Sequence, residues 1–438
     1  MNKKEQLIAA VDIGTTKVVA LVGKINENEK LEILALESTE SKGIKRGVVL
    51  NIDETVKSIS KVVNAVKAKS GYDFKEVFVG IAGQHIDSIR TSGHLHLDSY
   101  EHEITQADID TLISDIYKIP IDVGKEILHV IPQSYSVDNE IGIKNPIGFT
   151  GKRLAANFHI VTGEIASAKN IEKCINRCGL KIIELILEPL ASSASVLTED
   201  EKEAGVALID IGGGTTDIAV YYDNIIRHTA VIPIAGSTIT NDIKEGCSIL
   251  LRDAEKLKTE YGSALGEIAP DDKIITIPGI SGREPKEISF KRLAYIIQAR
   301  MEEIIGSAMF QIEKSGFAEK LSAGIVVTGG GALLKDISQL INFFTGYDVR
   351  IGYPSEYLAV GFDKDINHPK YATSIGLILK GSELLKKNNY VPEVKEELTE
   401  KSESEEQEKP KQKKESGIFA ALKRTLTDIF EENDARLQ

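Results

Sequence analysis

AAVDIGTTKVVALV (9–22) and ALIDIGGGTTDIAVYY (207–222) are two versions of one pattern, and this repeat decides the fold. Each copy is an apolar strand that reaches an aspartate, Asp12 or Asp210, and then a turn of glycine and paired threonines. Glycine lets backbone N–H groups approach an anion closely, and threonine hydroxyls add further donors. We therefore predict a duplicated α/β fold in which two phosphate loops, nearly half the chain apart, hold one nucleotide between them.

In the first loop, Gly14, Thr15, Thr16 and Lys17 are predicted to bind phosphate, with Lys17 supplying positive charge. Asp12, at the carboxyl end of a buried strand, is placed to hold a magnesium ion through water, because this ion keeps much of its hydration. An ordinary hairpin turn with a capping aspartate is the alternative for either copy alone.

The second loop contains three successive glycines. Inside a sheet each would raise the entropy cost of ordering, so close approach to a ligand explains them better. Asp210 is expected to mirror Asp12 at the metal, whereas Asp217, already on the next strand, is interpreted as structural. The predicted phosphate contacts of this loop are Gly212, Gly213, Gly214, Thr215 and Thr216.

A third glycine loop follows the apolar strand in IVVTGGGALL (325–334). Gly329, Gly330 and Gly331 are predicted to let the base and ribose lie against bare backbone, with a helix N-terminus near the phosphates. A tight connection between a strand and a helix is the alternative.

Three charged side chains complete the set of candidates. Glu255 and Lys258 are three residues apart on a predicted helix and can reach the two ribose hydroxyls together, although a solvated ion pair has the same spacing. Glu188 ends an apolar strand before Pro189, a position from which a carboxylate can orient an attacking water. Capping of the following helix is the alternative for Glu188.

The bulk composition indicates a multidomain globular protein. The chain has 438 residues, of which 42% are apolar and 27% charged. A net charge of −13 argues against nucleic-acid binding, which depends on a positive surface. No apolar run reaches about 18 residues and the N-terminus has no signal peptide, so we expect a protein inside the cell.

The three cysteines form no disulfide framework in a chain of this size. Cys174 and Cys178 lie four residues apart in a predicted helix. We interpret them as small core residues, with a redox or metal pair as the alternative.

Hydrophobic periodicity outlines the secondary structure of the first half. Strands are predicted over 6–12, 17–24, 31–38 and 77–83, with a helix over 53–69 whose N-cap is Asp53. Together these elements indicate a mainly parallel sheet covered on both faces. Residues 84–162, with more histidine and more alternation, are predicted to form an inserted subdomain.

The second half continues the pattern. A helix over 164–177 precedes 181–190, a strand that leads into a helix with Pro189 near its start. A charged helical insert covers 240–262, and Ser289 is the predicted N-cap of a further helix. From 386 to 416 charged residues of both signs replace almost all aliphatic ones, which is typical of a disordered linker.

Helical periodicity returns at the end of the chain, in residues 417–432. This segment is predicted to be an amphipathic helix that lies on an anionic membrane surface; a coiled-coil fragment and a partner-docking helix are the alternatives. The residues predicted to contact the membrane are Ile418, Phe419, Leu422, Lys423, Arg424, Leu426, Ile429 and Phe430. The chain has no Trp and acids follow Phe430, so we expect binding to depend on many weak anchors in one filament.

The three loops, the Glu188-Pro189 element and the AEKLK helix together resemble the actin, Hsp70 and sugar-kinase superfamily. Within it, ILHVIPQSYSVDNEIGIKNPIGFTGKRLAANFHIVTG (127–163) and TNDIKEGCSILLRDAEKLKTEYGSALGE (240–267) resemble the FtsA family of bacterial cell-division proteins. The similarity covers roughly residues 4–385. It implies a duplicated actin-like (ribonuclease H-like) ATPase fold with an inserted subdomain.

The resemblance also implies a function. Members of this family bind ATP with Mg²⁺, turn it over slowly at most, polymerise into filaments, and tether the tubulin-like division GTPase FtsZ to the membrane. The FtsZ tail is expected on residues 240–307, later division proteins on 84–162, and the protein at the cytoplasmic face of the membrane at the division site.

The implied subdomains are discontinuous in sequence. For the function, other bacterial actin-like filament proteins, for cell shape or pilus assembly, are the nearest alternative to the FtsA family. A small-molecule kinase or an Hsp70-type chaperone is a more distant alternative. The predicted parts are a first core subdomain (1–83, 163–191 and 365–385), the insert (84–162), a second core subdomain (192–239 and 308–364), a nucleotide-side subdomain (240–307), the linker (386–416) and the terminal helix (417–438).

Overall fold

The computed structural model describes residues 6–279, 281, 283–360, 364–388, 390–392 and 394–396. The chain divides into two units, 1–397 and 398–438. The second unit lies outside the described residues, and so do the predicted terminal helix (417–438) and most of the predicted linker.

The first core sheet has five strands in the order β12-β7-β1-β2-β3. β1 and β2 are antiparallel, as are β2 and β3, whereas β1, β7 and β12 run parallel. The prediction of a mainly parallel sheet is therefore wrong, because the short turns after β1 and β2 permit only antiparallel pairing. The bounds are β1 (Leu7–Ile13), β2 (Lys17–Ile25), β3 (Leu31–Glu40), β7 (Glu76–Ile81) and β12 (Lys181–Leu187).

The second core sheet repeats this topology, in the order β15-β14-β13-β18-β19. β13, β14 and β15 form the antiparallel part, and β18 and β19 run parallel to β13. Identical strand order and direction in both sheets confirm the predicted duplication. The bounds are β13 (Val206–Ile211), β14 (Thr216–Tyr222), β15 (Ile225–Ile232), β18 (Ile325–Thr328) and β19 (Val349–Ile351).

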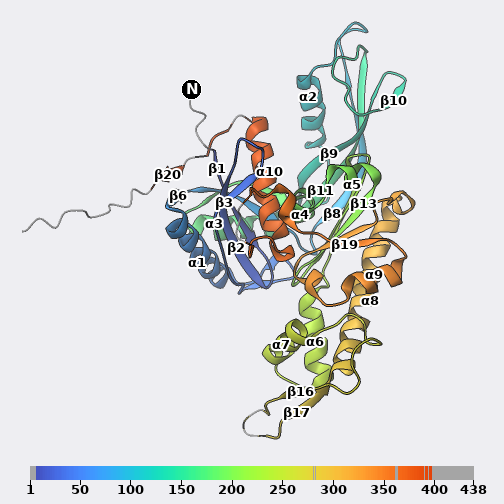
Figure 1. Cartoon of the computed structure of the whole chain (residues 1–438). Helices are drawn as coiled ribbons and strands as arrows, with labels where there is room; N and C mark the ends of the chain where they lie inside the picture. Colours follow the sequence, from blue (N-terminus) through green and yellow to red (C-terminus); the bar gives the residue numbers. More distant parts are fainter. Residues whose placement is uncertain are drawn as a thin grey trace, which may run out of the picture. The chain divides into compact units, whose positions relative to one another are not determined.

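Helices cover both faces of the first sheet. α1 (Ile52–Ser70) and α3 (Ile165–Arg177) pack on one face, and α10 (Ala372–Asn388) on the other (Figure 1). The predicted N-cap of α1, Asp53, is wrong: Asn51 occupies the cap, and its side chain accepts from the Glu54 N–H at 3.2 Å. An Asn side chain at this position satisfies an N–H group that the first helical turn leaves free.

α4 (Glu188–Val196) crosses α10 at the centre of the molecule. The two backbones touch, since a Cβ added at Gly376 of α10 would lie 1.8 Å from the Ala191 carbonyl oxygen of α4. The last residues of α4 also pack against the second core sheet, in a cluster with Leu208 and Val326. These two helices therefore join the two halves of the fold.

The second half has its own helical cover. α8 (Phe290–Ser315) and α9 (Ile337–Thr345) pack on the face of the sheet opposite α4. Ser289 caps α8 as predicted, accepting from the Arg292 N–H at 3.1 Å. The charged insert consists of α6 (Gly236–Cys247), α7 (Leu251–Tyr261), β16 (Ile274–Ile277) and β17 (Lys286–Ser289).

The inserted subdomain is a four-stranded sheet in the order β10-β9-β11-β8, with one helix on one face. The helix packs closely, because a Cβ at Gly93 of β8 would lie 2.6 Å from Cδ1 of Ile116. The bounds are β8 (Asp87–His96), α2 (Gln106–Ile116), β9 (Lys125–Val137), β10 (Glu140–Ile143) and β11 (Arg153–Glu164).

The remaining short elements lie in the two core domains. They are β4 (Ile44–Lys45), β5 (Val48–Val49), β6 (Tyr72–Phe74), α5 (Glu199–Ala204), η2 (Ala318–Lys320), η3 (Gly330–Leu333), η4 (Pro354–Tyr357), η5 (Pro369–Tyr371) and β20 (Val394–Glu396).

Buried histidines join this subdomain to the second core sheet. His159 of β11 is 1% exposed, and its Nε2 lies 2.9 Å from the Thr229 hydroxyl of β15. Its ring is 6.2 Å from that of His228, and Arg90 donates across the same junction to the Ser315 carbonyl at 2.6 Å. Burial lowers the pKa of His159 to about 4, and the positive potential of His228 and Arg90 adds to the effect.

Acidification is expected to weaken the protein at this junction. Because the pKa of His159 is lower in the folded than in the unfolded state, its stabilising contribution is present above about pH 6.5 and is lost toward pH 4. Lowering the pH from 7 to 5 should therefore cost about 2 kcal/mol of folding free energy, because the unfolded state gains a proton that His159 in the folded state largely does not. Calorimetry should show that the melting temperature falls less between pH 7 and pH 5 for His159→Gln than for the wild type. The exposed-site variant His94→Gln should lose as much as the wild type, and equal losses for all three proteins would contradict the assignment.

The ordered core extends further than predicted. The predicted linker start at residue 386 is wrong, since α10 continues to Asn388 and β20 pairs antiparallel with β6. The Tyr390 hydroxyl donates to the Glu76 carboxylate at 2.8 Å, which fixes this part of the chain beside the first sheet. Within the described ranges we find no candidate for a membrane-spanning helix.

Candidate functional site

The first predicted loop is the hairpin turn between β1 and β2. Asp12 is 4% exposed and accepts from the Ser374 hydroxyl of α10 at 2.6 Å. The Lys17 ammonium lies 3.8 Å from the Asp12 carboxylate and donates to the Lys370 carbonyl. Gly14 is needed for the turn itself, because a Cβ there would be 2.9 Å from the Lys17 carbonyl oxygen.

The second predicted loop is the equivalent turn between β13 and β14. Asp210 is also 4% exposed, and its carboxylate accepts from the hydroxyls of Ser192 at 2.5 Å and Thr373 at 3.0 Å. Asp12 and Asp210 are therefore bound by consecutive residues at the start of α10, Ser374 and Thr373. The Thr216 hydroxyl donates to the Ile234 carbonyl at 2.7 Å and is buried, so this predicted phosphate donor is engaged within the protein.

The two loops face each other at contact distance. A Cβ added at Gly213 would lie 2.3 Å from Cγ2 of Thr16, and one at Gly214 would lie 2.3 Å from Oγ1 of Thr15. No side chain fits between them, since real Cβ atoms do not approach other heavy atoms this closely. The glycines of the second loop thus permit the threonines of the first loop to lie against bare backbone.

A cavity of about 580 Å³ opens beside this contact. That volume lies in the range of small-molecule binding sites. Of the predicted residues, eight line the cavity: Thr16, Lys17, Gly212, Gly213, Glu255, Lys258, Gly330 and Gly331. Nine do not line it, and several of these lie buried behind the loops: Asp12, Gly14, Thr15, Glu188, Asp210, Gly214, Thr215, Thr216 and Gly329.

The cavity wall carries more lysines than carboxylates, although the whole chain has a net charge of −13. This balance favours an anionic ligand over a cationic one. The lysines are Lys17, Lys258, Lys273, Lys335 and Lys370, and the acids are Glu255, Glu260 and Asp336.

The predicted pair on α7 forms part of this wall. The Lys258 ammonium donates to the Glu255 carboxylate at 2.7 Å, the Thr240 hydroxyl at 2.8 Å and the Gly236 carbonyl at 3.0 Å. Gly236 in turn approaches the second loop, because its N–H donates to the Gly212 carbonyl at 3.1 Å. The ion pair is therefore anchored to the second loop.

The third glycine loop packs against the second one. Gly329 has a φ of 83°, and a Cβ there would lie 2.2 Å from the Asp210 carboxylate. Gly330 meets open space and lines the cavity. The predicted helix N-terminus at this loop is wrong: only the short 3₁₀ turn η3 follows, and α9 begins at Ile337.

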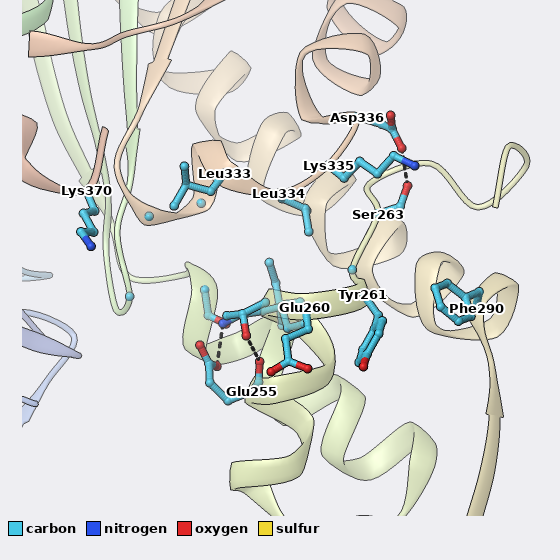
Figure 2. Close-up of a pocket in the computed structure, with 18 of the residues that line it drawn as sticks. Glu255, Glu260, Tyr261, Ser263, Phe290, Leu333, Leu334, Lys335, Asp336 and Lys370 are labelled. Atoms are coloured by element: carbon cyan, nitrogen blue, oxygen red, sulfur yellow. Dashed lines mark hydrogen bonds and ion pairs between the residues drawn. The ribbon is translucent and has the colours of Figure 1, made fainter. Parts of the chain in front are cut away.

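An apolar and aromatic end of the cavity was not predicted from the sequence. Tyr261 and Phe290 pack edge to face with ring centroids 5.6 Å apart. Figure 2 shows Leu333 and Leu334 facing Glu255 and Tyr261 across the cavity. The Ser263 hydroxyl donates to the Asp336 carboxylate at 2.7 Å beside this end.

Four carboxylates lie together beneath the two loops. The pKa of Glu188 is raised well above its usual range by burial and by the negative charges of Asp12, Asp217 and Asp210, with Lys17 opposing the shift. Burial also raises the pKa of Asp210, and burial with the charge of Asp210 raises that of Asp217. Such mutual repulsion creates a site that favours cations.

The acid cluster bears on two of the predictions. Asp217 was interpreted as structural, yet its Oδ1 is buried and has no hydrogen-bond partner among the described residues, so it belongs to the cluster. Glu188 begins α4, but no side chain caps this helix, which leaves the capping alternative without support. A Cβ at Gly80 would lie 3.2 Å from Cγ of Glu188, so glycine there makes room for the carboxylate.

Comparison with known proteins identifies the family. A family model described as "Cell division protein FtsA" matches residues 207–376, and one described as "SHS2 domain inserted in FTSA" matches residues 83–162. The cell division protein FtsA of Pseudomonas aeruginosa is 40% identical over 376 residues, which is 86% of this chain and 89% of that protein. This chain belongs to the FtsA family.

Further FtsA relatives give the same result. FtsA of Neisseria meningitidis is 41% identical over 379 residues, covering 86% of this chain and 91% of the relative. FtsA of Escherichia coli is 36% identical over 385 residues, with coverage of 86% and 91%. The family prediction from the sequence is therefore confirmed, and the insert formed by β8–β11 and α2 is the SHS2 domain.

Solved structures confirm that the chain has an actin-like fold. A chain of the PilM-PilN type IV pilus biogenesis complex matches with a TM-score of 0.60 at 15% identity, covering 85% of this chain and 98% of the other. MreB5 of Spiroplasma citri bound to AMPPNP matches with a TM-score of 0.52 at 14% identity, covering 88% and 99%. At these identities the similarity concerns the fold alone.

The cysteines of this chain contribute to its core. All three are free, and Cys174 is buried in the cluster between the first sheet and α1 and α3. Burial raises the pKa of the Cys174 thiol to about 11, which leaves very little reactive thiolate at neutral pH. The interpretation of Cys174 as a small core residue is confirmed.

Proposed function

We propose that this protein binds ATP in the cavity between the two loops. The observation that carries the proposal is the contact of Gly213 with Thr16, which unites two glycine loops from opposite halves of the chain at one lysine-rich cavity. Gly212, Gly213, Thr16 and Lys17 would bind the phosphates. Glu255 and Lys258 would contact the ribose, and Gly330 and Gly331 the adenosine.

The aromatic end supports an adenine base as the remaining part of the ligand. Tyr261 and Phe290 provide apolar contacts at the end of the cavity away from Lys370, and Leu333 and Leu334 line the wall between (Figure 2). A purine ring binds to such surfaces by stacking and dispersion, with little need for charged partners.

We further propose that Mg²⁺ accompanies the ATP at Asp12 and Asp210. Among the residues described, no group of three or more His, Cys, Asp or Glu side chains is arranged to coordinate one metal ion directly. The residues fit an ion held partly through water and phosphate oxygens, because the buried carboxylates repel one another and the Asp217 Oδ1 lacks a partner. When bound, the ion would neutralise negative charge on the phosphates.

Glu188 would orient the hydrolytic water. Burial and the charges of Asp12, Asp217 and Asp210 raise its pKa, so a cation bound beside it would favour the ionised form that accepts a hydrogen bond from water. This dependence on a bound cation supports slow ATP turnover at most, with the nucleotide serving mainly to set the assembly state.

At the level of the cell, we propose that this protein polymerises and tethers FtsZ to the membrane at the division site. The C-terminal tail of FtsZ would bind residues 240–307, and later division proteins would bind 84–162. The residues 417–438 would lie on the anionic cytoplasmic face of the membrane as a peripheral anchor. The match of the SHS2 model to 83–162 supports this role over cell-shape or pilus-assembly filaments.

Removal of residues 417–438 is expected to release the protein from anionic vesicles while leaving its binding to an FtsZ tail peptide unchanged. The reason is that the apolar face of this segment is the only proposed membrane contact. Co-sedimentation with vesicles and a peptide pull-down provide the two measurements. Leu422→Glu should act like the deletion, whereas Thr427→Glu, on the polar side with the same charge change, should not. Unchanged vesicle binding after the deletion would refute the anchor, and failure to bind the peptide would refute the tether.

A further inference from the structure

One face of the SHS2 sheet is covered by α2, and the upper part of the other face is open. Side chains alternate along each strand, so Ser92, His94 and His96 of β8 share the open face. Their cross-strand partners on β11 are Asn157, Ala155 and Arg153. Except for Ala155, which is partly covered, these residues are exposed. The face is therefore polar and accessible along two neighbouring strands.

Two hollows lie on this face and share three lining residues, Ser92, Ser134 and Asn157. The upper hollow, of about 220 Å³, contains His94, Ser136 and Arg153. The lower one, of about 480 Å³, contains Arg90, Gln133, Arg227 and Phe317, and lies where the SHS2 sheet meets the second core domain. Together they form one continuous polar groove.

The groove contains no acidic residue, in a chain with a net charge of −13. Its three arginines make no ion pair with any carboxylate in the described part of the chain. Arg90 donates to the Ser315 carbonyl, and Arg227 donates to the carbonyls of Tyr222 and Gln133 at 3.2 and 3.4 Å. These guanidinium groups thus keep free donors, although the negative charge of Asp223 acts on Arg227.

Among the residues that the structure describes, the one carboxylate bonded at the upper end is already engaged. Asp138, at the end of β9, accepts from the backbone N–H groups of Lys152 and Arg153 at 3.1 and 2.9 Å. It binds the turn before β11 and leaves the Arg153 guanidinium without a bonded acid. Arginine is well suited to bind carboxylates through paired donors, so the groove favours an acidic ligand.

The spacing of the positive charges indicates an extended ligand. Arg90 and His94 are four residues apart on β8, which corresponds to about 13 Å along a strand. One small anion can contact the positive groups at only one end of the groove. Between the ends lie hydroxyl and amide groups of Ser92, Ser134 and Asn157, which can bind the N–H and C=O groups of a peptide backbone.

We propose that this groove is a docking site for an acidic, extended peptide segment of a partner protein. One carboxylate would bind Arg153 and His94, and a second, about 13 Å away, would bind Arg90 and Arg227. The polar residues between them would bind the peptide backbone. A bilayer is a poorer fit, because a flat surface cannot enter a groove with walls formed by Phe317 and the end of β10.

The test uses the full-length protein and a short fluorescein-labelled peptide in which glutamate alternates with serine. Fluorescence anisotropy should show saturable binding that weakens as salt is raised, and no binding of the same peptide with glutamine in place of glutamate. Arg153→Glu should weaken binding at least about tenfold, and Arg153→Gln about threefold. Lys118→Glu, two residues after the end of α2 and outside the groove, carries the same charge change and should bind as the wild type does.

Four results would overturn the proposal. The first is equal binding of the glutamine peptide, and the second is unchanged affinity of Arg153→Glu with a native circular dichroism spectrum. The third is an equal loss in Lys118→Glu, which would indicate a general charge effect. The fourth is a loss of anionic-vesicle binding or of self-association in Arg153→Glu while the peptide affinity stays the same, which would assign the face to lipid or to a second copy of this chain.

Discussion

Gly213→Ala is expected to abolish ATP binding while leaving the fold intact. The added Cβ would lie 2.3 Å from Cγ2 and 2.4 Å from Oγ1 of Thr16. Threonine is short and branched, so it cannot move aside without moving its own backbone. The two loops would therefore separate, and the phosphate contacts on both sides would be lost together. We expect affinity for Mg²⁺–ATP to fall by at least about 100-fold, equivalent to about 2.7 kcal/mol.

Calorimetric titration of the purified protein with Mg²⁺–ATP would measure this loss. Gly306→Ala is a matched control, since Gly306 lies inside α8, away from the cavity, and an added Cβ there meets only Cζ of Phe344 at 3.9 Å. It should bind ATP normally and melt at the same or a slightly higher temperature, because alanine favours a helix over glycine. Normal ATP affinity in Gly213→Ala would contradict the assignment of the phosphate site.

Glu188→Gln is expected to stabilise the nucleotide-free protein and to remove most ATP hydrolysis. Glutamine has nearly the same shape but no charge, so it relieves the repulsion with Asp12, Asp210 and Asp217. Since the pKa of Glu188 is higher in the folded than in the unfolded state, folding becomes less favourable as the pH rises from the unfolded toward the folded value. The variant should therefore melt a few degrees above the wild type at pH 8, with a smaller difference at pH 5.

Hydrolysis provides the second measurement for this variant. Loss of a carboxylate that orients water should lower the turnover rate about 100-fold while the affinity for ATP changes little. Glu172→Gln, on the exposed side of α3, should leave both quantities unchanged. A variant that hydrolyses ATP at the wild-type rate would show that Glu188 does not orient the water. A melting temperature below that of the wild type at pH 8 would show that the cluster is not repulsive.

The repeated loops were predictable because their chemistry is local. The sequence pattern of strand, aspartate, glycine and threonine fixes a tight turn wherever it occurs, and two copies imply two related halves. The strand directions were not predictable from apolar runs alone, since buried parallel and antiparallel strands have similar composition; the short turns after β1 and β2 carried that information. The spacing of Glu255 and Lys258 fits both a ribose contact and a solvated ion pair. The family resemblance favoured the ribose contact.

The parts of the site that escaped prediction are those assembled from distant segments. Tyr261 and Phe290 come from a helix end and a helix start with an irregular segment and a hairpin between them, and no spacing rule connects them. Asp217 looked structural because it lies within a strand, and only the fold shows that its carboxylate faces Asp210. The hydroxyls of Ser192, Thr373 and Ser374 also follow no motif that we recognised, although they bind both loop aspartates.

The backbone contact of Ala191 with Gly376 brings the two halves of the fold together at the crossing of α4 and α10. Hydrogen bonds from Ser195 to the Ala372 carbonyl and between the hydroxyls of Ser192 and Thr373 fix the two helices at the same crossing. Thr373 and Ser374 lie one turn from this point and bind Asp210 and Asp12. Any rotation of one half against the other must therefore pull on both carboxylates at once. The positions of the two carboxylates and the angle between the halves are in this way one mechanical variable.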